Sequence, residues 1–124
     1  MRAIITVCQM LFRLFWLVNI VLGILFWTGH VTGLVPLHIL LGIILTLLLV
    51  ILALLAGIRG KPGLLVVGVI VAILLPVVGL NQQSWDQGSG HWIIQVLHLL
   101  VGILAIVTAE AIGGRIKRLS KARA

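Results

Sequence analysis

Two histidines open the same short phrase in different parts of the chain. His38 begins the phrase His-Ile-Leu-Leu-Gly, which ends at Gly42, and His98 begins His-Leu-Leu-Val-Gly, which ends at Gly102. Both phrases lie in long apolar stretches, where an ionisable side chain is costly and is by default a functional hypothesis. Two matched imidazoles in such surroundings indicate that the histidines share a ligand.

The composition of the chain explains these apolar surroundings. Of the 124 residues, 62% are hydrophobic and 9% are charged, and the mean hydropathy is +1.34. A soluble domain of this size needs a mostly polar surface, so the sequence predicts an integral membrane protein. Four apolar stretches, each near the roughly 20 residues that a helix needs to cross a bilayer, predict a single four-span domain over residues 1–124. The spans are expected at about 11–28, 32–58, 64–80 and 92–112.

The basic residues predict the orientation of these spans. The nine Lys and Arg residues lie within the first 13 residues, between the second and third spans, or in the C-terminal tail. Arg13 is inside the first span but close enough to the inner interface for its side chain to snorkel. With four spans these places share one face, which the positive-inside rule assigns to the cytoplasm. We therefore expect a multi-pass membrane protein with both termini in the cytoplasm. This topology and attraction to anionic lipids account for the net charge of +7, so nucleic acid is not an expected partner.

The matched phrases also indicate two helical hairpins in tandem, and hence an all-α bundle with up-down-up-down order. In such a bundle the second and fourth helices face each other diagonally, at about 11–14 Å if neighbours pack roughly 8–10 Å apart. Two imidazoles facing across that gap leave space for an iron, and Gly42 and Gly102, one turn below, leave room for a flat macrocycle. We predict that His38 and His98 ligate one haem b. The lone Cys8 offers no site for covalent haem attachment.

The depth of the two histidines matches only if the second helix begins early. With Gly33 as its N-cap, Pro36 becomes the third helical residue, where the missing N–H has no intrahelical partner to lose. In the fourth span, Gln95 lies three residues before His98 on the same face. Gln95 is therefore predicted to contact the cofactor.

Other interpretations of the histidines stay open. The central pair suits either two neutral imidazoles hydrogen-bonded across the bundle or a bare metal ion. His30 and His91 lie further out, where a solvated interfacial histidine is the commonest case. They also suit a propionate partner, a proton-transfer group beside a quinol, or the imidazole ligands of a copper site. Glu110 is expected to pair with Arg115 or Arg59, so it adds no catalytic carboxylate.

With its paired phrases, His38 to Gly42 and His98 to Gly102, the chain resembles membrane b-type cytochromes, in which four helices hold haem between histidines on opposing helices. The chain is also similar to small bacterial four-span proteins with this phrase in the second and fourth spans. The resemblance implies electron transfer by a bis-histidine haem, with a quinol or a redox protein as partner, rather than a self-sufficient enzyme. The inner half of the chain contains no histidine, which favours one haem near the outer face.

Two further classes of function compete with this expectation. A non-catalytic accessory subunit of a larger membrane complex would use its histidines to bridge helices and would be colourless. A transporter or channel would need a continuous polar path, and the inner half of the bundle offers only Asn19 and Thr46 for one. The accessory subunit is therefore the main alternative to a cytochrome.

Overall fold

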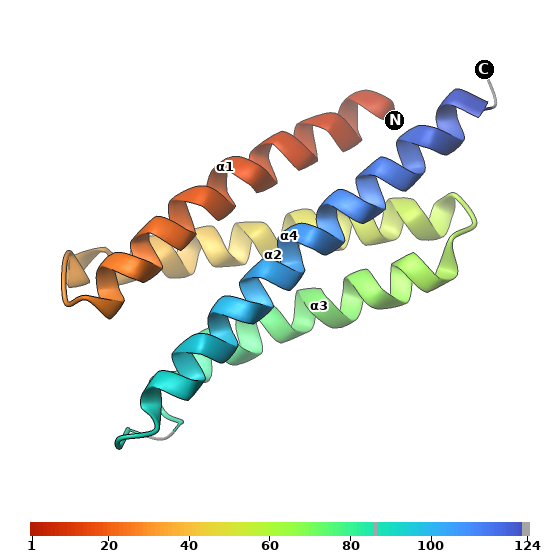
Figure 1. The fold of residues 1–124 in the computed structure, drawn as a ribbon. Helices are drawn as coiled ribbons and strands as arrows, with labels where there is room; N and C mark the ends of the chain where they lie inside the picture. The colour runs from red at the N-terminus through yellow and green to blue at the C-terminus, as the bar shows by residue number, and fades with distance from the viewer. Residues whose placement is uncertain (86, 123–124) are drawn as a thin grey trace.

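Four helices form nearly all of the chain (Figure 1). The computed structural model describes residues 1–85 and 87–122. The helices are α1 (Arg2–Trp27), α2 (Val35–Ile58), α3 (Pro62–Asn81) and α4 (His91–Ala122), with a short 3-10 turn, η1 (Thr32–Leu34), before α2. The all-α prediction is confirmed, and each of the four helices is long and apolar enough to cross a membrane. Asp86 and Arg123 lie outside the described residues.

The helices extend beyond the predicted apolar stretches. The first helix begins at Arg2 rather than near residue 11, and the fourth ends at Ala122 rather than near residue 112, because hydropathy marks only the most apolar part of a helix and regular backbone hydrogen bonding continues past it. The predicted N-cap at Gly33 is wrong, since the N-cap of α2 is Leu34. Pro36 is compatible with the first turn in either register, and the preceding residues close a 3-10 turn in which the Leu34 N–H donates to the Val31 carbonyl at 2.8 Å.

The four helices pack in a ring. Contacts join α1 to α2, α2 to α3, α3 to α4 and α4 to α1, and α2 also meets α4 across the middle. Among the described residues, α1 and α3 do not touch. Both termini lie at one end of the molecule, together with the turn between α2 and α3 (Figure 1). The helices that carry the two matched histidines therefore meet in the centre of the ring.

The half of the molecule near the termini is tightly packed, because small residues let the helices approach. A Cβ at Gly68 of α3 would lie 2.6 Å from Cβ of Ala53 in α2 and 2.9 Å from Cδ1 of Ile112 in α4. Such distances are below normal contact, so only glycine permits this three-helix junction. The largest fully buried side chains of the protein come from α1, α2 and α4: Ile5, Phe12, Leu49, Leu52, Ile112 and Ile116.

Glu110 pairs with a residue that the sequence analysis did not select. Both of its carboxylate oxygens accept hydrogen bonds from Arg13, at 2.7 Å each, and one also accepts from Nε2 of Gln9 at 3.1 Å. The predicted pairing with Arg115 or Arg59 is therefore wrong. Arg115 lies five positions after Glu110, so the two side chains point to different faces of α4. The face that carries Glu110 packs against α1.

The outer surface of the bundle is apolar along its length. On α1, for example, Leu14, Leu17 and Val21 are exposed, and large hydrophobic side chains are likewise exposed on the other three helices. A monomer in water rarely exposes so continuous an apolar surface. These apolar helices are compatible with contact with a lipid bilayer.

The junction at Gly68 leads to a test with a matched control in the same helix. Gly68→Ala should lower the stability of the detergent-solubilised protein by about 1–3 kcal/mol, because the new methyl group overpacks the contact with Ala53. Gly63→Ala adds a methyl group where no atom lies within 4 Å, so it should leave stability unchanged or slightly raised. Thermal unfolding followed by circular dichroism measures both, and equal midpoints for the two variants would contradict the close approach.

Candidate functional site

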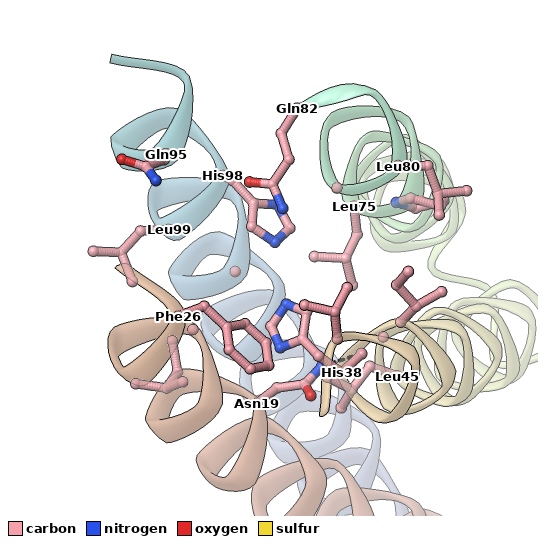
Figure 2. A pocket seen from close by; sticks show the side chains of 18 of the residues that line it. Asn19, Phe26, His38, Leu45, Leu75, Leu80, Gln82, Gln95, His98 and Leu99 are labelled. Carbon is pink, nitrogen blue, oxygen red and sulfur yellow. Dashed lines mark hydrogen bonds between the residues drawn. The ribbon is translucent and has the colours of Figure 1, made fainter. Parts of the chain in front are cut away.

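The half of the molecule remote from the termini contains a cavity of about 450 Å³. It is lined by residues of all four helices, and the matched histidines lie at its centre (Figure 2). Cofactor and ligand sites in proteins typically enclose about 300–1,000 Å³, so the cavity has the size of a small-molecule site.

His38 and His98 face each other inside this cavity (Figure 2). Their ring centroids are 6.0 Å apart and their planes are inclined by 67°. The Nδ1 atom of each ring is buried without a hydrogen-bond partner among the described residues. The two rings therefore lie close together in the cavity, and neither Nδ1 atom is used in a hydrogen bond within the described structure.

Helix α1 holds His38 in place. The side-chain amide of Asn19 donates to the main-chain carbonyl of His38 at 3.2 Å, and the ring of Phe26 meets the imidazole edge-on at 5.4 Å between centroids. Gly23 lies beside the imidazole, where a Cβ would be 3.8 Å from Cε1. The Oδ1 atom of Asn19 is buried and lacks a partner within the described structure.

The glycines around the histidines differ in their surroundings. A Cβ at Gly79 would lie 2.9 Å from Cε1 of His98, so this glycine, which sequence reasoning missed, lets α3 approach the ring. Gly42 is in ordinary contact range of Asn19, at 3.7 Å from a built Cβ to Nδ2. A Cβ at Gly102 would meet nothing within 4 Å. Of the two predicted glycines, Gly102 therefore borders open space in the cavity, and Gly42 packs against α1.

Trp16 is the residue of α1 nearest the N-terminus that lines the cavity. Its half-buried indole donates a hydrogen bond from Nε1 to the carbonyl of Gly102 at 2.8 Å. This hydrogen bond joins α1 to α4. Sequence reasoning missed this role. The available signal was an indole N–H in an apolar helix, because a buried indole normally finds an acceptor.

The end of the cavity remote from Trp16 is polar. Gln95 lines the cavity as predicted for a cofactor contact, together with His91, Gln82 and Gln83. Gln82 follows α3, and its side chain points into the cavity (Figure 2). The cavity therefore has apolar walls around the histidine pair and amide and imidazole groups at one end.

The structure treats the two outer histidines differently. His91 lines the cavity, whereas His30 is exposed, and its Nδ1 atom lies 3.0 Å from the hydroxyl of Thr28. Within residues 1–85 and 87–122, no group of three or more His, Cys, Asp or Glu side chains is placed to hold a metal ion. The copper site built on His30 and His91 stays a prediction without a third protein ligand.

No protein-family model, curated protein or solved structure matches this chain. The function is therefore argued from the geometry of the site.

The bond between Trp16 and Gly102 leads to a second test. Trp16→Phe should lower the free energy of unfolding by about 0.5–1.5 kcal/mol, because it removes one buried hydrogen bond and leaves the ring-sized volume largely filled. Trp92→Phe is the control, since Trp92 is exposed and a change there should have little effect. Unfolding by denaturant in micelles compares the variants; a Trp16 variant as stable as the control would argue against the interhelical bond.

Proposed function

We propose that the protein is a membrane cytochrome in which His38 and His98 hold one haem b and which transfers electrons. The observation that carries this proposal is the pair of facing imidazoles, 6.0 Å apart between centroids, inside a cavity of about 450 Å³. The Nδ1 atoms of both histidines are buried and lack a partner in the described structure, which is also consistent with side chains that bind a group from outside the protein.

The chemistry of the ligands favours haem over a bare metal ion. Two imidazoles face the centre of the cavity, and the described residues place no third His, Cys, Asp or Glu beside them. Structural and catalytic zinc sites use at least three protein ligands, whereas haem brings its own four nitrogens and needs only axial ligands. Two opposed histidines therefore supply all the protein ligands that a haem needs, but too few for a zinc site.

When bound, haem would supply reversible one-electron chemistry, and His38 and His98 would hold it. The residues of the chain would hold and shield it. Asn19 and Phe26 keep His38 in position, and the apolar walls exclude water. Gln82 and Gln95, at the polar end of the cavity, would bind the propionate carboxylates.

The proposal includes an orientation in the membrane. We infer two tandem hairpins in up-down-up-down order in a bacterial inner membrane, with the termini in the cytoplasm. The positions of the basic residues support this, because the described Lys and Arg residues belong to the two terminal segments and the α2–α3 turn, which lie at one end of the molecule (Figure 1). The cavity would then lie near the outer face, where a quinol or a redox protein is the proposed electron partner.

Absorption spectra of the purified protein test the proposal. After expression with ample haem, the oxidised and dithionite-reduced wild type should show the sharp bands of a low-spin b-type haem. His38→Ala and His98→Ala should each lose this spectrum, since either change removes an axial ligand. His30→Ala is the matched control and should keep it, because His30 does not line the cavity.

Two outcomes would count against the proposal. A colourless wild type would favour the accessory subunit, whose histidines only bridge helices and which would co-purify with partner subunits. An unchanged spectrum in His38→Ala and His98→Ala would place any haem elsewhere. Circular dichroism of the same samples distinguishes loss of haem from loss of the helical fold.

A further inference from the structure

A second recess lies at the opposite end of the molecule, between the α2–α3 turn and α4. It has a volume of about 460 Å³ and shares no lining residue with the histidine cavity. We call it the basic groove; its lining residues are Gly60, Lys61, Pro62, Gly63, Leu64, Val67 and Arg115.

Two cations from different elements flank the basic groove. Lys61 belongs to the turn before α3, and Arg115 projects from α4. Glu110 is the only acidic residue that the structure describes, and Arg13 occupies both of its oxygens. No described carboxylate is therefore left to neutralise Lys61 and Arg115. The groove offers paired positive charge to an anion from outside the chain.

The basic groove has a charged part, at Lys61 and Arg115, and an apolar part along α3. A Cβ at Gly60 or at Gly63 would meet no atom within 4 Å, so bare backbone borders the charged part. Gly60 has φ +71°, a conformation that favours glycine in this turn. Further along α3, half-buried Leu64 and exposed Val67 form the wall. Its occupant should therefore carry an anionic group and an adjoining apolar chain.

We propose that the basic groove binds one anionic phospholipid, with the phosphate between Lys61 and Arg115 and an acyl chain along Leu64 and Val67. Basic pockets at the cytoplasmic ends of membrane helices attract anionic headgroups, each cation adding to the affinity. A phospholipid combines this charge with the apolar chain that the wall requires. The inference rests on the membrane orientation of the proposed function and is independent of the haem.

Native mass spectrometry of the detergent-purified protein, mixed with phosphatidylglycerol and phosphatidylcholine, tests this site. The wild type should retain one phosphatidylglycerol in preference to phosphatidylcholine. The double variant Lys61→Gln/Arg115→Gln should bind phosphatidylglycerol about tenfold more weakly or worse, because both cations at the phosphate are lost. Lys117→Gln/Lys121→Gln removes the same charge outside the groove and should bind like the wild type.

Equal losses in the two double variants would overturn the site, because they would show a general attraction to positive charge. Unchanged binding in the groove variant would overturn it as well. Glycerol phosphate should not displace the lipid; displacement would show that the apolar wall contributes nothing. The haem spectrum and membrane fractionation of the same variants keep a failure here distinct from a failure of the proposed function.

Discussion

The close approach of three helices at Gly68 is the constraint on which the rest of the structure depends. Because that position has no side chain, Ala53 and Ile112 press directly against α3 and draw α2 and α4 together near the termini. At the other half, the same helices carry imidazoles in place of small residues, and their rings stand 6.0 Å apart in a cavity of about 450 Å³. One half thus provides the packing that stabilises the bundle, and the other half can hold a ligand.

The unpaired polar atoms follow this division. An unsatisfied buried polar group costs about 1–3 kcal/mol, so proteins rarely keep several without a reason. Among the described residues, four buried side-chain atoms lack a partner, and three of them belong to Asn19, His38 and His98, which all line the cavity. The fourth belongs to Gln9, which binds Glu110 through its other amide atom. Most of this free-energy cost therefore falls on residues that line the cavity, where a bound ligand would reduce it.

Charge is distributed along the same axis. Arg13 and Glu110 neutralise each other between α1 and α4, so no carboxylate of the described residues is left to pair with Lys61 or Arg115. The residues that line the cavity, by contrast, include amide and imidazole side chains but no Lys, Arg, Asp or Glu. In the proposed orientation, the cationic inner end would meet anionic lipids, and the outer end would enclose the proposed haem.

The sequence alone determined the local properties of this protein. Hydropathy and residue spacing were sufficient to predict four apolar helices and to select His38 and His98 as a pair, because both signals act within one helix turn or one span. Only the tertiary structure decided which faces meet: Arg13 rather than Arg115 as the partner of Glu110, Gly79 beside His98, and Trp16 bound to Gly102. Such contacts depend on the rotation of each helix about its axis and on which helices are neighbours. Those quantities are set by packing of the whole bundle, to which every helix contributes, and local sequence patterns leave them open.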